Sequence, residues 1–491
     1  MQDLQKVKTL LVEERILAAF VNRAKAALIA SYREAWQQGS VNRRIFAAML
    51  TVGTLTAAVK VVSTFKEMVV ARQFGVSDGL DALLIAYLLP SFAINVVAGS
   101  FNAALVPTYI QVREQEGHQA AQRLFSSVVV WSAALLIGVS ILMGFAAPYL
   151  LPILGSGFTP EKLTLTRQLF FILLPTLPLS GLFATWVAVL NANERFALAA
   201  ITPVATPIVA IALVYGMGDV WGIYAFAVAM IAGAIVEGIL LASGLARRGI
   251  SLVPRWHGFS PAMRQVMKQY APMIAAGVLM NSTVIVDQAM AATLGAGSVS
   301  VLSYGNKAVA MMLGVGSLAL STAILPQFSH MVAAKDWSAV RHTLKTYARL
   351  VLMSAVPVTV GLMLVSRFIV MMLFERGAFT ASNTLEVAAV QNLYLLQMPF
   401  YLVGMLFVRL ISALGANYIL LWGTAISAVM NVTLDYLLMK WLGVSGIALS
   451  TSIVYIAALA FLSLMALRAL KKAEAQTSNL AGGPVVATEA S

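Results

Sequence analysis

Apolar runs follow one another at a steady pace from about residue 45 to residue 469 of the chain. Each run is long enough for the roughly 20 residues that a helix needs to cross a bilayer. Because backbone groups inside hydrocarbon must form their hydrogen bonds within the segment, spans of this length are helical. The sequence therefore predicts an all-α polytopic membrane protein with about twelve spans, near 45–71, 82–110, 124–150, 166–190, 196–217, 220–244, 270–293, 298–327, 346–374, 384–414, 418–440 and 443–469.

The composition supports this class and excludes others. Hydrophobic residues make up 60% of the chain and charged residues 11%, more apolar sequence than a soluble core needs. The absence of cysteine excludes a disulfide framework and a thiolate metal site. There is no Walker-type loop, no nucleophile–base pair and no ligand-spaced histidine, so we expect neither an enzyme nor a bound metal or other cofactor.

The basic residues concentrate in alternate loops. The net charge of +13 does not indicate nucleic-acid binding, because no basic, aromatic-interleaved soluble domain accompanies it. The positive-inside rule instead predicts that the basic side is cytoplasmic, with both chain ends inside. The cations on that side are Arg113, Arg123, Arg195, Arg247, Arg248, Arg255, Arg264, Lys268, Lys335, Arg341, Lys345, Arg349, Arg468, Lys471 and Lys472.

The two halves of the chain resemble each other. Ala-Leu-Val-Pro-Thr-Tyr at 104–109 resembles Ala-Ile-Leu-Pro-Gln-Phe at 323–328, and Gly-Phe-Thr at 157–159 resembles Ala-Phe-Thr at 378–380. Pro175 and Pro399 match in the same order, as do Leu-Asn-Ala-Asn at 190–193 and Leu-Gly-Ala-Asn at 414–417. Six spans per half give both halves the same direction, so we predict two six-helix lobes related by a pseudo-two-fold axis along the membrane normal.

The predicted domains are derived from this repeat. The two lobes cover 45–245 and 270–470, with a basic cytoplasmic linker at 246–269 between them. Residues 1–44 have helical hydrophobic periodicity with basic residues largely on the other face, which suits either an amphipathic helix on the membrane surface or a poorly ordered leader. Residues 471–491 are expected to be disordered.

A few charged residues lie within or at the start of the apolar runs. Lys60, Lys66 and Glu67 lie in the first run, Asp81 opens the second, and Lys307 lies deep in the eighth. Ionisable groups at this depth are costly and usually face a water-filled interior or a partner, so they mark a candidate substrate path. The alternative is that Glu67 only neutralises a lysine, or that the lysines reach to the interface.

Polar stripes accompany these charges. On the second span, Ser91, Asn95, Gly99 and Asn102 share one face of an ideal helix, and they either line a hydrated cavity or mediate helix packing. The corresponding stripe on the eighth span contains Ser303, Lys307, Gly314 and Ser321, and Asn306 beside Lys307 is a further cavity candidate.

Two carboxylates lie in the second half. Asp287 on the seventh span is expected to neutralise a cavity lysine, to bind a coupling cation, or to pair structurally with the nearest lysine. Asp435 on the eleventh span is a weaker case, with Arg409 as a candidate partner.

Several of these motifs resemble the MurJ/MviN family of lipid II flippases, in the MOP superfamily (multidrug, oligosaccharidyl-lipid and polysaccharide exporters). The similar segments are Phe-Lys-Glu-Met-Val-Val-Ala-Arg-Gln-Phe-Gly at 65–75, Asp-Ala-Leu at 81–83, Leu-Pro-Ser at 89–91, Phe-Asn-Ala-Ala-Leu-Val-Pro at 101–107, Val-Asp-Gln at 286–288, Gly-Ser-Val-Ser at 297–300, Tyr-Gly-Asn-Lys at 304–307 and Ile-Leu-Pro at 324–326.

The resemblance implies which residues bind the substrate. The family's cavity arginines, taken to bind the diphosphate of a lipid carrier, are matched by Lys60, Lys66 and Lys307, with Asn306 in place of the usual Asp. Ile94 and Asn95 occupy the positions of an arginine pair on the second span. Lysine keeps the charge but lacks the bidentate fork of arginine.

The hypothesis from the sequence is a flippase of the bacterial inner (cytoplasmic) membrane. It moves a polyprenyl-diphosphate-linked glycan of the lipid II type from the inner to the outer leaflet by alternating access of the two lobes. The alternatives are a flippase for an exopolysaccharide or O-antigen repeat unit, a cation-coupled drug exporter, and a non-transporting scaffold. The expected partners are the lipid-linked glycan, membrane lipids, a coupling ion and the glycan-synthesis machinery, with no nucleic acid.

Overall fold

The computed structural model describes residues 41–481, with side chains described from 51 to 477 apart from 98, 101–103, 276, 318–319 and 321–323. The predicted N-terminal segment lies outside the described residues except for 41–44, which begin the first helix. At the other end, the last helix continues to Ala481. The prediction of disorder from residue 471 is therefore wrong for 471–481, a stretch rich in Ala, Lys and Glu, which are strong helix formers.

Helices build every predicted span. The first six spans are α2 (Val41–Phe74), then α3 (Asp78–Ala93) with the π-helix η1 (Ile94–Ala98) and α4 (Gly99–Glu116), then α5 (His118–Leu154), then α6 (Pro160–Leu173) with α7 (Thr176–Ala192), then α8 (Phe196–Ile201) with the 3-10 turn η2 (Thr202–Val204) and α9 (Ala205–Trp221), then α10 (Ile223–Ala246). The second six are α11 (Pro261–Ala292), α12 (Ser298–Ala333), α13 (Trp337–Phe374), α14 (Ala381–Leu395) with α15 (Gln397–Ala413), α16 (Tyr418–Leu442) and α17 (Val444–Ala481).

The membrane prediction is confirmed in outline. Ten helical segments of the described chain are long and apolar enough to cross a bilayer. The helices α2 and α12, of 34 and 36 residues, cover the two remaining predicted runs. They are the two helices that carry the charges Lys60, Lys66, Glu67 and Lys307.

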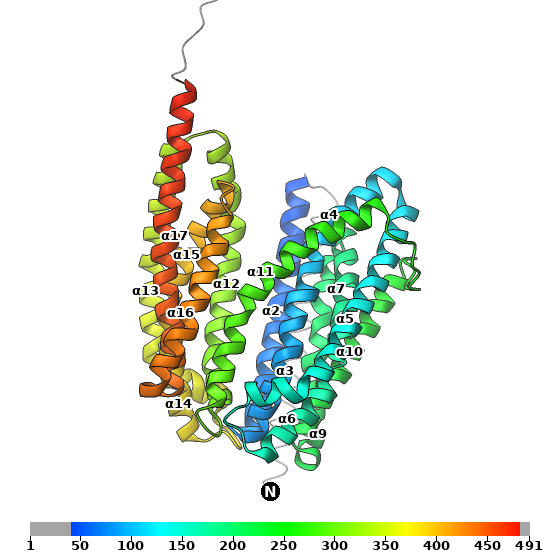
Figure 1. The fold of residues 1–491 in the computed structure, drawn as a ribbon, viewed down its shortest axis with the longest axis vertical. Helices are drawn as coiled ribbons and strands as arrows, with labels where there is room; N and C mark the ends of the chain where they lie inside the picture. The colour runs from blue at the N-terminus through cyan, green and yellow to red at the C-terminus, as the bar shows by residue number, and fades with distance from the viewer. Residues whose placement is uncertain (1–40, 482–491) are drawn as a thin grey trace, which may run out of the picture.

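The helices form two lobes, shown in Figure 1. One bundle contains α2 to α10 and the other α12 to α17, and the two bundles meet at the end where α3, α6 and α14 begin. Toward the other end the ribbons diverge. The first lobe has its own buried apolar core at the diverging end, whereas at the meeting end one continuous core extends across both lobes.

The repeated motifs occupy equivalent places in the two lobes. Thr159 and Thr380, the last residues of the two matched tripeptides, are the N-caps of α6 and α14. Each of these helices begins the fourth span of its lobe, and each fourth span is broken midway, next to Pro175 in the first lobe and Pro399 in the second. Proline lacks the N–H that a continuous helix would need.

The lobes also meet through backbone, in two reciprocal contacts. Ala378 N–H donates to Arg72 C=O at 2.8 Å, and a Cβ on Gly377 would lie 2.3 Å from that same oxygen. On the opposite side, a Cβ on Gly157 would lie 2.5 Å from Ala292 C=O. Each contact joins the end of a lobe's first span to the loop before the other lobe's fourth span, the arrangement that a pseudo-two-fold axis produces.

Helix α11 joins the two lobes. Its first half packs in the core of the first lobe through Met263, Val266 and Tyr270, and the Tyr270 hydroxyl donates to Val97 C=O at 2.8 Å. Its second half packs against the other core through residues such as Ile285. The helix begins at Pro261, so the predicted linker at 246–269 is shorter, and the predicted lobe boundary at 270 falls inside a helix that both lobes share.

Candidate functional site

A charged cluster of Lys66, Glu67 and Lys307 links the two lobes, near the last turns of α2 and the first turns of α12. Glu67 on α2 accepts from Lys307 on α12 through one carboxylate oxygen, and Lys66 lies 2.6 Å from the other. The Glu67 and Lys307 positions are 240 residues apart in the sequence. The ammonium groups also lie over aromatic rings, Lys307 at 4.6 Å from the Tyr304 centroid and Lys66 at 5.5 Å from that of Phe226.

The charged cluster keeps a net positive charge. It contains two ammonium groups and one carboxylate, which gives a formal charge of +1. It is not dry, because 31% of the Lys307 side chain, 22% of Lys66 and 19% of Glu67 remain accessible. A partly accessible cluster with excess positive charge can bind an anionic group.

Lys60 lies two helical turns before Glu67 on α2 and is exposed. Its ammonium group makes no ion pair with any residue of the described chain. Its backbone C=O accepts from the Thr64 hydroxyl at 2.9 Å, a contact within the same helix. Its predicted role in substrate binding stays a prediction.

The polar stripe on the second span is not the continuous face that an ideal helix would give. Pro90 lies inside α3, and the span then passes through the π-helix η1. A π-helical turn contains more residues than an α-helical turn and so rotates the later residues about the helix axis. Ser91 is half-buried and donates to Leu88 C=O at 2.9 Å, Asn95 is exposed, and the Asn102 side chain lies outside the described ones.

On the eighth span, Ser303 is half-buried, whereas Asn306 and Gly314 are exposed. Asn306 precedes Lys307 and contributes no ionic contact to the charged cluster. The Ser321 side chain lies outside the described ones. The proposed lining role of this stripe stays a prediction.

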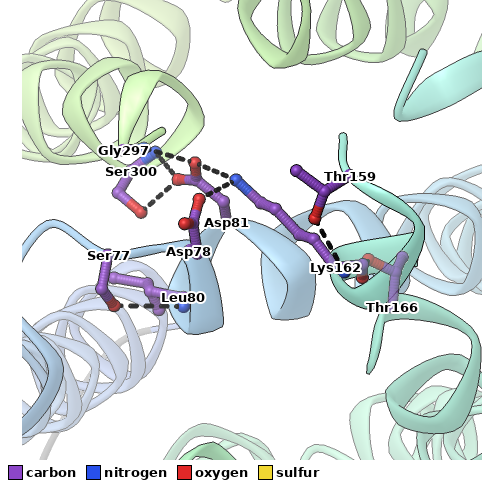
Figure 2. Close-up of polar contacts among 9 residues, drawn as sticks. All are labelled: Ser77, Asp78, Leu80, Asp81, Thr159, Lys162, Thr166, Gly297 and Ser300. Carbon is purple, nitrogen blue, oxygen red and sulfur yellow. Dashed lines mark hydrogen bonds and ion pairs between the residues drawn. The ribbon is translucent and has the colours of Figure 1, made fainter. Parts of the chain in front are cut away.

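Asp81 lies in a polar knot where the lobes meet (Figure 2). Its Oδ2 accepts from the backbone N–H of Gly297 at 2.7 Å and from Lys162 Nζ at 2.9 Å. Its Oδ1 accepts from the N–H and hydroxyl of Ser300 at 2.8 and 2.6 Å. Lys162 also contacts Asp78 at 2.5 Å. We call this set, Asp78, Asp81, Lys162, Gly297 and Ser300, the junction knot.

The junction knot joins three elements by charge and by helix polarity. Asp81 and Asp78 come from α3 and Lys162 from α6, both in the first lobe, while Gly297 and Ser300 form the first turn of α12 in the second. A carboxylate at a helix N-terminus satisfies free N–H groups and interacts favourably with the helix dipole. Asp81 therefore fastens the second lobe to the first.

The expectation that Asp81 lines a cavity is wrong, because its side chain is completely buried. Its charge is balanced by Lys162, itself only 7% exposed, and by three hydrogen bonds from the other lobe. A gating role for Asp81 stays a prediction. Lys162 was not among the residues predicted from the sequence, because its partners lie 84 and 81 residues away and no local pattern marks it.

Asp287 does not contact a lysine in the described part of the chain. Its carboxyl group is in contact with that of Asp435 and with the Asn431 side chain. Asp435 and Asn431 are almost fully buried on α16, and Asp435 also accepts from the Ser450 hydroxyl on α17. The expected pairing of Asp287 with a lysine is therefore wrong, since the charged group that it contacts is a second carboxyl.

The contact between Asp287 and Asp435 has the composition of a cation or proton site. One oxygen each of Asp287, Asp435 and Asn431 is buried without a hydrogen-bond donor in the described chain. Two carboxylates in contact repel each other unless a proton or a cation lies between them. No group of three or more acidic, His or Cys residues occurs among the described residues, so oxygen atoms of neutral side chains would have to complete such a site.

Comparison with known proteins identifies the family. The chain matches the family described as "Lipid II flippase MurJ" over residues 69–488. It is 26% identical to a probable lipid II flippase MurJ of Synechocystis over 421 residues, covering 82% of this chain and 78% of that protein. It is 28% identical to the lipid II flippase MurJ of Burkholderia cenocepacia over 386 residues, covering 75% and 72%.

Solved structures agree on the fold. The fold is similar to that of a lipid II flippase MurJ in an inward closed conformation, with a TM-score of 0.74 and 23% identity over 87% of this chain and 90% of that one. It is also similar to an inward-facing multidrug resistance MATE family transporter of the MOP superfamily, with a TM-score of 0.71 and 15% identity over 84% and 95%. The two-lobe fold and the sequence match lead to one conclusion: this chain belongs to the MurJ family of lipid II flippases.

Proposed function

We propose that this protein moves a polyprenyl-diphosphate-linked glycan of the lipid II type across the bacterial cytoplasmic membrane. A hydrated sugar with two phosphate charges does not cross hydrocarbon unaided. The observation that carries the proposal is the charged cluster, which has a formal charge of +1, remains partly accessible and takes its residues from both lobes. Family membership supports the same substrate.

The position of the charged cluster between lobes supplies a mechanism for release. When the diphosphate binds, it competes with Glu67 for the two ammonium groups. Because Lys307 lies on α12 and Lys66 on α2, a change in lobe separation moves the two charges apart and weakens their joint hold on the substrate. Lys60, exposed on α2, adds a third positive charge on the same helix.

The charge distribution supports an inward-facing state. The junction knot closes the end of the molecule where α3, α6 and α12 begin. The basic loops, including 247–260 between α10 and α11, belong to the opposite end of the helices. The positive-inside rule assigns that basic end to the cytoplasm, so the closed junction faces outward and its opening is the step that releases substrate to the outer leaflet.

The Asp287–Asp435 contact supports coupling to a cation. A cation bound there would satisfy the three buried oxygens that lack donors. Asp287 lies on α11, the helix that packs in both lobes. A bound cation would therefore change how α11 packs against the two lobes.

A second candidate substrate is a lipid-linked exopolysaccharide repeat unit. The lysines at the diphosphate positions keep the charge but lack the two-pronged geometry of arginine, and they would contact the diphosphate that both lipids share. Both candidates require the same charged cluster and differ in the glycan.

Complementation tests the proposal. The gene is expressed in a strain depleted of its lipid II flippase, and growth is scored together with the amount of lipid II that an extracytoplasmic hydrolase can cleave. We expect rescue by the wild type, loss of rescue by Lys307→Gln, and full rescue by Lys440→Gln, an exposed lysine at the end of α16. No rescue despite normal membrane insertion would reject lipid II and leave the exopolysaccharide unit.

A further inference from the structure

A cavity in the described part of the chain lies outside the charged cluster. It has a volume of about 840 Å³ and is formed where four segments of the first lobe end, namely α4, the start of α5, the turn after α7 and the end of α10. Tyr109 lines it together with His118, Gln122, Arg123, Arg195 and Arg248. It shares no residue with the charged cluster, the junction knot or the Asp287–Asp435 contact.

The cavity concentrates positive charge that nothing in the described chain neutralises. Arg123, Arg195 and Arg248 are exposed and form no ion pair with the described residues. No carboxylate lines the cavity, so its formal charge is +3 with His neutral. The nearby Arg113 differs, because its guanidinium is occupied by Glu114 at 3.0 Å and by Ala192 C=O at 3.0 Å.

The chemistry of the lining selects a class of ligand. Guanidinium groups bind phosphate oxygens through paired, charge-assisted hydrogen bonds. Three guanidinium groups from three separate segments, with the amide of Gln122 and the hydroxyl of Tyr109 beside them, can surround one phosphate. We propose that this cavity binds a phosphate group, carried either by an anionic phospholipid headgroup or by a soluble phosphate compound.

The same cavity is attached to the segment that connects the lobes. Arg248 lies near the start of the stretch 247–260 between α10 and α11, and Gln122 donates to Ser251 C=O at 2.8 Å. Farther along α5, Ser126 accepts from the Arg255 N–H at 2.6 Å and Ser127 from the His257 N–H at 3.1 Å. A bound phosphate would therefore hold the connecting segment against α5, next to the start of α11.

Hydrogen exchange of the full chain in nanodiscs tests the proposal. One arm uses phosphatidylcholine nanodiscs titrated with inorganic phosphate, and the other replaces part of the phosphatidylcholine with phosphatidylglycerol. We expect slower exchange in 118–126 and 247–257, and an apparent affinity at least about tenfold weaker in Arg123→Gln/Arg195→Gln/Arg248→Gln. Protection by phosphate identifies a soluble ligand, and protection by phosphatidylglycerol alone identifies a lipid.

A matched variant separates site binding from general charge. Lys345→Gln/Arg349→Gln/Lys471→Gln removes three exposed cations from the second lobe and should retain the wild-type affinity. Two results would overturn the proposal: an equal loss of apparent affinity in both triple variants, or no protection from exchange by either probe in the wild type. If the pocket triple variant does not fold, Arg248→Gln alone, on the exposed connecting segment, is compared with the wild type for its apparent affinity.

Discussion

Asp81→Asn should open the junction between the lobes. All four groups that face the Asp81 carboxylate are donors, so an amide in either orientation turns its NH2 toward N–H or O–H groups. Removing one charge of a buried pair costs about 3–5 kcal/mol, because the other charge stays buried without compensation. Lys162 keeps Asp78 at 2.5 Å, so we take the lower end, about 3 kcal/mol.

That free energy corresponds to a shift of about a hundredfold or more in the ratio of closed to open junction. Cross-linking can measure it, since the chain has no cysteine of its own. A Cβ at position 297 lies 3.8 Å from Val76 Cβ, which matches the separation in disulfides. In a Val76→Cys/Gly297→Cys parent, Asp81→Asn should slow disulfide formation in membranes by a large factor.

Asp78→Asn is the matched control for this measurement. Asp78 contacts the same Lys162 but is 60% exposed, so its loss should cost about 0–1 kcal/mol and change cross-linking less than about fivefold. Any strain from Gly297→Cys is present equally in the double-cysteine parent, in Asp81→Asn and in Asp78→Asn. Equal cross-linking in the parent and in Asp81→Asn, or an equal decline in both Asn variants, would refute the view that the buried carboxylate holds the lobes together.

Three further predictions concern the charged cluster, the backbone contacts and the carboxyl contact. Glu67→Gln raises the formal charge of the cluster from +1 to +2. The variant should therefore bind a diphosphate lipid more tightly in a binding assay and release it more slowly. Weaker binding would contradict the charge argument. Gly377→Ala should lower the melting temperature by several degrees more than Gly415→Ala. Both glycines have positive φ, but only Gly377 lies close to another backbone segment. Equal shifts in melting temperature would contradict the close contact. Asp287→Asn should abolish any rise in melting temperature that sodium chloride gives over equal choline chloride, and a retained rise would exclude a sodium site there.

The sequence predicted the fold well because membrane spans are local features. Length and apolarity predicted twelve spans; ten helical segments of the described chain are long and apolar enough to cross a bilayer, and α2 and α12 cover the other two runs. The repeats predicted two related lobes, in which the matched tripeptides end at the N-cap threonines of α6 and α14. Two helix ends differ from the predicted limits. The predicted start of the second lobe at 270 and of the disordered tail at 471 both fall inside helices, because α11 and α17 continue beyond the apolar runs.

The candidate residues were found more easily than their partners. Charges within apolar sequence are visible at once, which is why Lys66, Glu67 and Lys307 were predicted together. Their partners depend on contacts across 240 residues for the charged cluster and 219 for Asp81 and Ser300, which no local pattern reveals. Asp81 was expected in a cavity for this reason, since its neutralising residue, Lys162, belongs to a loop region by sequence.

Transport in proteoliposomes tests whether Lys66 and Lys307 hold the diphosphate of the substrate during transport. The rate at which a fluorescent polyprenyl-diphosphate glycan crosses the bilayer is compared between the wild type, Lys66→Gln/Lys307→Gln and Lys440→Gln, each reconstituted at equal density. We expect wild-type transport by Lys440→Gln and a loss of at least about tenfold when both lysines of the cluster are neutralised. Undiminished transport by Lys66→Gln/Lys307→Gln would contradict this role of the two lysines.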